Sequence, residues 1–401
     1  MADKSQYHII VAGGGPAGLA AACLLAIEGM QVTCVTGEAA QKQPDPRTIA
    51  LMQPAIRLLR HIGIWPDSLQ QSACALRKLK LVDDTGSLMA APTVTFSAEE
   101  IGADAFGWNI PVERLSEALQ DCAEASGVRF VAADAESCAM VDGQAQVRLK
   151  DGDALNGQIV IAADGRASRL RATAGISTID WSYDQAAIAA SFDHTAAHHG
   201  ISTEYHKSAG PLTTVPMPNG RSALVWMEKP AIADELMTLP DADFARRLQL
   251  ETHGDLGLIS NIGPRKSFPM RGLTASVFAR NRLMLVGEAA HVVPPIGAQG
   301  LNISMRDAAL AAQLISDATG WGEDPGSAKT MQTYDTERRR DVLPRQAVIH
   351  TLNTSLLAQL APFHILRAIG LTAISQIAPM RERVVREGLA PQRGLPRIMR
   401  G

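Results

Sequence analysis

The stretch VAGGGPAGLAAACLLAIEGMQVTCVT, residues 11–36, contains the pattern that decides the fold. It begins with the end of an apolar strand predicted over His8–Ala12, passes through a glycine turn and ends in a second apolar strand. Gly13, Gly15 and Gly18 form Gly-x-Gly-x-x-Gly directly after the first strand and at the start of an alanine-rich helix. Such a turn lets backbone amides at a helix N-terminus approach the pyrophosphate of a dinucleotide. The stretch therefore predicts a strand, turn and helix that bind a dinucleotide.

Length and composition indicate a globular enzyme-sized protein, because 401 residues with 46% hydrophobic content can bury a large core. A net charge of −3 argues against a nucleic-acid partner. The N-terminal MADKSQYH lacks the apolar core of a secretion signal, so we expect a cytoplasmic protein. The five cysteines are scattered without metal-ligand spacing, which indicates reduced thiols and no metal site.

Near the C-terminus the sequence is apolar and then basic. Leu356–Pro379 is interrupted by polar residues, so it predicts a pair of helices with one apolar face and not a membrane span. Residues 380–401 hold six Arg and two Glu and predict a frayed tail; the alternative is peripheral docking to a membrane surface or a multi-enzyme complex. The run Glu337–Asp341 predicts a solvated helix face.

Two further apolar runs, Gln158–Ala163 and Arg282–Val286, are each closed by a glycine-containing turn and predict parallel strands. The carboxyl ends of parallel strands form the edge of a sheet at which ligands gather. Alternating, turn-rich sequence over 76–97 and 179–269 predicts a second sheet. The predicted helices are Ala17–Gly29, Thr48–Ile62, Pro111–Gly127, Gly300–Ala318 and Ser327–Asp341.

A motif follows each of the two later strands: Ala163-Asp164-Gly165 after the first, and Gly287-Glu288-Ala289-Ala290-His291 with PPIGAQGLN (residues 294–302) after the second. With the glycine turn, these motifs resemble, in order, those of the class A FAD-dependent aromatic monooxygenases. The C-terminal pattern is most similar to the ubiquinone-biosynthesis hydroxylases. Its residues are Gly300-Leu301-Asn302, Arg306-Asp307, Leu366 to Leu371, Pro379 and Gly388-Leu389.

The resemblance implies an α/β fold in which a Rossmann-type FAD-binding domain is interleaved with a β-sheet substrate domain and followed by a helical C-terminus. The expected boundaries are 1–73, 98–178 and 270–340 for the FAD-binding domain, 74–97 and 179–269 for the substrate domain, and 341–401 for the helical segment. The implied reaction uses NADPH or NADH and O2 to hydroxylate a phenolic ring through a C4a-hydroperoxyflavin. The implied substrate is a lipophilic polyprenyl-phenol intermediate of ubiquinone biosynthesis.

The resemblance also assigns roles within the three motifs, and no side chain is identified as the catalytic base. The backbone of Pro295 is the expected group for positioning or relaying a proton, whereas His291 is expected to be structural and hydrogen-bonded to backbone. The expected FAD-binding residues are Gly13, Gly15, Pro16, Ala17, Gly18, Thr36, Glu38, Arg47, Arg114, Asp164, Gly287, Glu288, Pro295, Gly297, Gln299, Gly300, Leu301 and Asn302.

Two residues depart from the family pattern. Thr36 stands where the family has a Glu that accepts hydrogen bonds from the adenosine ribose, and Glu288 replaces an Asp. Glu38 lies two residues beyond Thr36, so ribose recognition is expected to be shifted or weakened and not lost.

Two other readings stay open at this point. A flavin-dependent reductase or halogenase shares the same fold, and a non-catalytic flavoprotein scaffold would tolerate the two departures. Trp108–Pro111 partly matches a halogenase motif but is expected to form a loop leading into a helix. Substrate selection is expected to fall to the second sheet, with residues 210–226 in the pocket floor.

Overall fold

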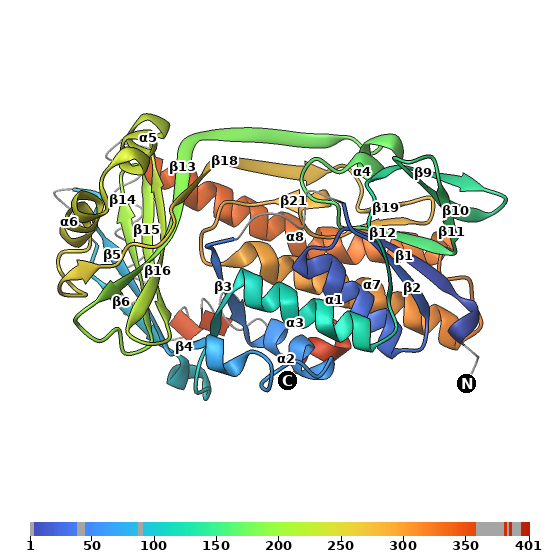
Figure 1. The fold of residues 1–401 in the computed structure, drawn as a ribbon, viewed down its shortest axis with the longest axis horizontal. Helices are drawn as coiled ribbons and strands as arrows, with labels where there is room; N and C mark the ends of the chain where they lie inside the picture. The colour runs from blue at the N-terminus through green and yellow to red at the C-terminus, as the bar shows by residue number, and fades with distance from the viewer. Residues whose placement is uncertain (1–3, 38–44, 87–90, 358–380, 383–384, 387–393) are drawn as a thin grey trace.

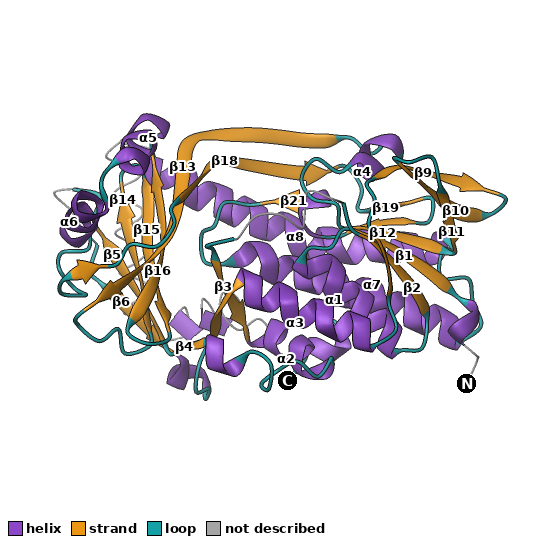
Figure 2. Cartoon of the chain, viewed as in Figure 1, coloured by secondary structure: helices purple, strands orange, loops and turns teal. Residues whose placement is uncertain are grey.

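The computed structural model describes residues 4–37, 45–86, 91–357, 381–382, 385–386 and 394–401. Its two largest sheets stand apart, with a block of helices beside one of them (Figure 1; Figure 2). Two long antiparallel strands, β13 (Thr178–His194) and β18 (Lys266–Ala275), run from one region to the other (Figure 1). The fold is therefore mixed α/β, as the sequence predicts.

The first sheet, six-stranded within the described residues, has the order β19-β20-β12-β1-β2-β8. All its strands are parallel except β19. The three strands predicted to carry the motifs, β1, β12 and β20, are adjacent, so their carboxyl ends meet at one edge. The bounds are β1 His8–Ala12, β2 Gln31–Val35, β8 Arg129–Val131, β12 Ile159–Ala162, β19 Ala279–Arg280 and β20 Leu283–Leu285.

The helix after the glycine turn, α1, is buried along most of its length because its alanine and leucine side chains are apolar on every face. It packs against α3 and α7. The main helices of this region are α1 Pro16–Ile27, α2 Gln53–His61, α3 Val112–Ala125, α4 Arg169–Thr173, α7 Gln299–Gly320 and α8 Ala328–Leu357. Short 3-10 helices are η1 Lys4–Gln6, η3 Gln70–Ser72, η4 Ala98–Ile101, η5 Gly287–Ala289 and η7 Arg397–Met399.

The helix predicted over Thr48–Ile62 is wrong in its first part. Thr48–Met52 forms β3, which pairs with β7 (Gly107–Pro111), and α2 starts only at Gln53. Pro54 has no N–H and fits the first turn of a helix, so it favours a helix start there. The loop predicted at Trp108–Pro111 is also wrong, because these residues lie in β7, the middle strand of a β3-β7-β4 sheet.

The second large sheet, nine-stranded among the residues described, has the order β21-β18-β13-β16-β15-β14-β5-β6, with β17 beside β13. Helices α5 and α6, which the sequence did not predict, cover its outer face (Figure 1). The remaining bounds are β4 Cys74–Leu76, β5 Lys78–Asp83, β6 Val94–Ser97, β9 Ala135–Val141, β10 Gln144–Leu149, β11 Ala154–Gly157, β14 Ile201–Lys207, β15 Gly210–Met217, β16 Arg221–Glu228, β17 Ile259–Ser260, β21 His291–Val292, α5 Pro230–Thr238 and α6 Asp241–Glu251.

The frayed tail predicted at the C-terminus is wrong for its last described residues. Leu395 and Met399 are buried in the main core, and Arg397 forms an ion pair with Asp317 on α7. Arg57 on α2 donates a hydrogen bond to the carbonyl of Met399. The helical pair predicted over Leu356–Pro379 lies almost entirely outside the described residues. Among the helices that are described, none has the length and apolar character needed to span a membrane.

Candidate active site

The three predicted motif loops converge at the carboxyl edge of the six-stranded sheet. A Cβ atom built on Gly13 would lie 2.1 Å from the carbonyl oxygen of Ala163, so the first and second loops are in backbone contact. A Cβ atom built on Gly287 would lie 3.6 Å from Cβ of Ala17, which places the third loop beside the start of α1. Three segments far apart in the sequence thus frame one site.

Glycine occurs at positions 13, 15 and 18 of the first loop for different physical reasons. Gly13 has φ +126°, and a Cβ built on Gly18 would lie 2.1 Å from the carbonyl oxygen of Gly13, so the fold itself requires both residues. Gly15 has φ −79°, and a Cβ there would meet nothing within 4 Å. Because the chain does not need a glycine at 15, the open space in front of α1 fits a ligand.

That space faces backbone donors. Gly15 is the N-cap of α1 and Pro16 its first residue, and no side chain caps the helix. The unpaired N–H groups and the helix dipole favour an anion such as a pyrophosphate. Thr36, which directly follows β2, lies beside the same turn, since a Cβ built on Gly14 would be 2.7 Å from Cγ2 of Thr36.

Asp164 in the second loop has one carboxylate oxygen that can accept a hydrogen bond from a ligand. Its Oδ2 accepts a hydrogen bond from the N–H of Leu170, while its buried Oδ1 has no partner in the described structure. Burial raises the pKa of Asp164, although hydrogen bonds from Ser168 and Leu170 oppose the rise. A buried acceptor without a donor is costly, about 1–3 kcal/mol, so a ligand hydroxyl or N–H fits this position.

Arg47 and Glu288 bring charge to the third loop. Arg47 pairs with Asp45 through two nitrogens and lies 5.1 Å from the ring centroid of Phe268. The hydrogen bond that Arg47 donates to Asp45 raises the pKa of Arg47, and the charge of Glu288 adds to the rise. Glu288 is exposed, so its carboxylate is accessible to a ligand.

Asp307 on α7 anchors the third loop, a role that the sequence did not reveal. Its fully buried carboxylate accepts hydrogen bonds from the N–H of Gly287 at 2.9 Å, from Nε2 of His291 at 2.7 Å and from Nε of Arg338 at 2.6 Å. Burial alone would raise the pKa of Asp307, but Arg338 and His291 outweigh it and hold the pKa below its usual value.

This anchor corrects two expectations. His291 is structural, but its ring nitrogen bonds to the Asp307 carboxylate and not to backbone. Arg338 is not part of a solvated face, because it is 1% exposed and also pairs with Asp341. The run of five charged residues at 337–341 does not indicate that one of these side chains points into the interior. The Arg306-Asp307 pair in the C-terminal pattern was the available signal.

The loop before α7 presents backbone groups. Gly297 and Ala298 have positive φ values of 61° and 54°, and no side chain caps α7 at Ala298. Asn302 donates to the carbonyls of Ala50 and Ala298 and accepts from the N–H of Met52. Because the side-chain amide of Asn302 already forms these hydrogen bonds, a contact between Asn302 and a cofactor would be made by the backbone of Asn302.

The same loop meets the inner face of the nine-stranded sheet. Val293 and Ile296 belong to an apolar cluster with Ala187 of β13, Met227 of β16 and Ile349 of α8. Pro295, between them, is exposed. The loop therefore has backbone groups on one side and an apolar wall on the other.

Of the remaining residues predicted to bind FAD, some lie at the start of α7 and others lie elsewhere. Gly300 and Leu301 lie in the first turn of α7, and Gln299 donates to the carbonyl of Gly297. Arg114 lies in the first turn of α3, exposed and paired with Glu117, and no contact recorded among the described residues joins it to the three loops. Glu38 lies outside the described residues.

The fold and site define a flavoprotein monooxygenase. The chain belongs to the FAD-binding domain family, whose model matches residues 6–347. The predicted family, fold class, FAD cofactor and enzyme class are confirmed.

Two curated relatives match over nearly the whole chain. "Ubiquinone hydroxylase UbiL" of Rhodospirillum rubrum is 30% identical, with 100% of this chain and 94% of that protein covered. "3-demethoxyubiquinol 3-hydroxylase" of Escherichia coli is 25% identical, with 95% and 98% covered. Among solved structures, p-nitrophenol 4-monooxygenase PnpA of Pseudomonas putida has TM-score 0.77 at 21% identity, covering 96% of this chain and 98% of that one, and so supports the fold.

Proposed function

We propose that this enzyme hydroxylates the aromatic ring of a polyprenylated phenol in ubiquinone biosynthesis, with NADPH or NADH as reductant and O2 as the oxygen source. The names of the two curated relatives support the pathway. The observation that carries the proposal is the position of the loop Val293–Ala298 between the flavin-type site and the apolar inner face of the sheet.

The residues of this chain hold the cofactor at its charged and polar parts. The amides at the start of α1 would bind the pyrophosphate, and the open space at Gly15 would admit it. Oδ1 of Asp164 and the carboxylate of Glu288 would accept hydrogen bonds from sugar or ribityl hydroxyls, and Thr36 would offer one hydroxyl to the adenosine ribose. The amides at the start of α7 would stabilise negative charge on the flavin ring.

Bound FAD supplies hydride acceptance from the nicotinamide and activation of O2 for transfer of one oxygen atom to the ring. The protein contributes orientation and exclusion of water, for which the apolar cluster around Ile296 and Met227 is suited. The backbone of Pro295 positions the substrate hydroxyl or relays its proton. A phenol with a prenyl tail fits an apolar wall better than a charged one.

The division into 1–73, 98–178 and 270–340 against 74–97 and 179–269 remains part of this proposal. So does contact of the segment 341–401 with a membrane surface or a partner enzyme. Equal turnover of prenylated and tail-less phenols would count against the lipophilic substrate.

One labelling experiment tests the proposed hydroxylation directly. The purified yellow protein is incubated with NADPH, 18O2 and 2-prenylphenol, and the product is identified by mass spectrometry. One labelled oxygen in the ring supports the proposal. NADPH oxidation with a product that lacks labelled oxygen would indicate a reductase or halogenase, and FAD-free protein that still restores the pathway in cells would indicate a scaffold.

A further inference from the structure

We propose that His206, held by Glu204, accepts the phenolic proton of the substrate; this inference rests on the function proposed above. His206 and Glu204 lie two residues apart on β14, and Nε2 of His206 is 2.7 Å from Oε1 of Glu204. Both side chains are buried, with exposures of 3% and 6%. The other ring nitrogen of His206, Nδ1, is buried and has no hydrogen-bond partner in the described structure.

The pleat of β14 places this pair on the inner face of the sheet. Successive side chains of a strand point to opposite faces, so Glu204 and His206 share one face and Tyr205 takes the other. Tyr205 packs with Leu212, Trp226 and the other residues of the core under α5 and α6. The pair therefore faces away from those helices, toward the side on which the loop before α7 lies.

Strand register connects the pair to that loop. Glu204 lies opposite Thr213 of β15, and Thr213 lies opposite Val225 of β16, so all three share a face. Val225 and Met227 pack in the apolar cluster that contains Ile296 of the loop. Two strand spacings, roughly 10 Å, separate Glu204 from Val225, so the pair and the apolar cluster lie on the same face of the sheet, two strands apart.

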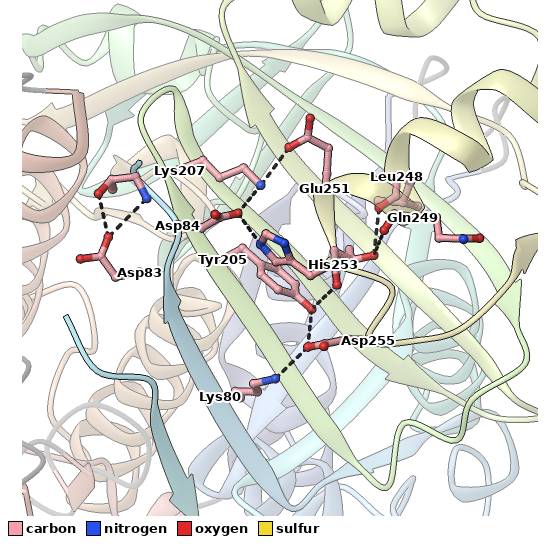
Figure 3. A network of polar contacts seen from close by, with 12 residues as sticks. Lys80, Asp83, Asp84, Tyr205, Lys207, Leu248, Gln249, Glu251, His253 and Asp255 are labelled. Atoms are coloured by element: carbon pink, nitrogen blue, oxygen red, sulfur yellow. Dashed lines mark hydrogen bonds and ion pairs between the residues drawn. The ribbon is translucent and has the colours of Figure 1, made fainter. Parts of the chain in front are cut away.

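The ionisable side chains that Figure 3 labels on the outer face are paired, in contrast to Nδ1 of His206, whereas Nε1 of Trp226 on that face also has no hydrogen-bond partner in the described structure. Figure 3 shows Tyr205, Lys207, His253 and Asp84 in one network: Tyr205 bonds to Asp255, Lys207 to Asp84 and Glu251, and His253 to Asp84 at 3.0 Å. The histidine nitrogen without a partner thus lies on the face turned toward the proposed substrate.

The neighbouring strands do not supply the missing partner. On β5, Asp83 lies opposite His206 in register, but its carboxylate accepts hydrogen bonds from Thr85 and from the N–H of Ala91. On β15 the residue opposite His206 is Pro211, which has neither charge nor N–H. An external donor is therefore the simplest partner for Nδ1.

The proton transfer needs no reactant other than the phenol, His206 and water. With Glu204 as a carboxylate, Nε2 of His206 carries the hydrogen that it donates, and Nδ1 has a free lone pair. The O–H bond of the phenol breaks, its electron pair stays on oxygen, and an N–H bond forms at Nδ1. After the ring is hydroxylated, the imidazolium returns its proton to that oxygen while the ring carbon loses its own proton to water. Glu204 orients the imidazole and stabilises its charge.

The variant His206→Gln is the sharpest test, because the Gln amide nitrogen can take the place of Nε2 and keep the bond to Glu204 while Nδ1 is removed. The matched control is His253→Gln, which changes the exposed histidine–carboxylate pair on the outer face. With FAD content unchanged, we expect ring hydroxylation of 2-prenylphenol to fall about 100-fold or more in His206→Gln while NADPH oxidation continues and forms H2O2. His253→Gln should stay within twofold of wild type.

A second readout does not depend on turnover. Binding of 4-nitrophenol to the wild-type holoenzyme and to His253→Gln should increase the absorbance of its phenolate, and binding to His206→Gln should not. If His206→Gln does not fold, Glu204→Gln, which should also weaken the phenolate signal, takes its place.

The outcomes separate the two proposals. A wild-type enzyme that ionises bound 4-nitrophenol through His206 but hydroxylates no phenol would overturn the proposed function and support this inference. A wild-type enzyme that hydroxylates 2-prenylphenol, with His206→Gln equal to it, would overturn this inference and leave the function standing. Unchanged 4-nitrophenol absorbance with the wild type would also overturn it.

Discussion

Replacing Asp307 by Asn tests whether one buried carboxylate holds the third loop in place. The side chain is 0% exposed and accepts hydrogen bonds from Gly287, His291 and Arg338. Asn has nearly the same shape but is neutral, and its NH2 group would face N–H groups where the carboxylate accepted. Among the described residues, Arg338, itself buried, would keep only Asp341 as an anionic partner.

The expected size of the effect follows from this burial. Removing one member of a buried ion pair costs about 3–5 kcal/mol, because the remaining charge stays in a medium that solvates it poorly. A typical domain has about 5–15 kcal/mol of stability, so the loss is a large share of the total. Since the N–H of Gly287 also loses its acceptor, we expect FAD to bind at least roughly tenfold more weakly, which corresponds to about 1.4 kcal/mol.

The measurements are equilibrium unfolding in urea, with refolding verified, and FAD titration of the apoprotein. The control is Asp317→Asn on the same helix, where the carboxylate is 38% exposed and pairs with exposed Arg397. We expect the control to lose less than about 1 kcal/mol. A loss for Asp307→Asn as small as that of the control, with unchanged FAD affinity, would refute the anchoring role.

Three further predictions concern the same region. Gly15→Ala should leave the urea midpoint of the apoprotein nearly unchanged and weaken FAD binding about tenfold or more. Gly13→Ala should instead destabilise the apoprotein itself, because Gly13 has φ +126° and the new Cβ would lie 2.1 Å from a carbonyl oxygen. Glu288→Asp should retain FAD and Glu288→Ala should lose it during gel filtration; equal FAD content in the alanine variant would remove the hydroxyl-binding role. The pKa values of Asp307 and Asp341 are below normal in the folded state. The stability that these carboxylates give to the folded protein should therefore be complete above pH about 4 and decline as the pH falls further, by up to about 1.4 kcal/mol per pH unit for each. Unfolding at several pH values should show a shallower decline in Asp307→Asn.

The fold was predictable where the sequence carries a local pattern. The three strands His8–Ala12, Ile159–Ala162 and Leu283–Leu285 are short apolar runs that end in glycine-containing turns, and this alone predicts buried parallel strands with loops at one edge. Prediction failed where pairing partners decide the structure. Thr48–Met52 reads as part of an amphipathic helix but becomes a strand because Gly107–Pro111 pairs with it.

The site was predictable at its glycines and not at its buried charges, and the reason is geometric. A glycine required by a tight turn is visible in sequence because few other residues fit there. Asp307 and Arg338, by contrast, become partners only when α7 and α8 pack together, 31 residues apart in the chain. His206 is a further case, since its significance depends on which face of β14 is turned inward, and that is decided by Tyr205 packing beneath α5 and α6. A one-residue shift in the register of β14 would move His206 to the outer face and Tyr205 to the inner one. A crystal structure with a bound phenol should show Glu204 opposite Thr213 and the phenolic oxygen beside Nδ1 of His206; a phenol bound away from this face would refute the assignment.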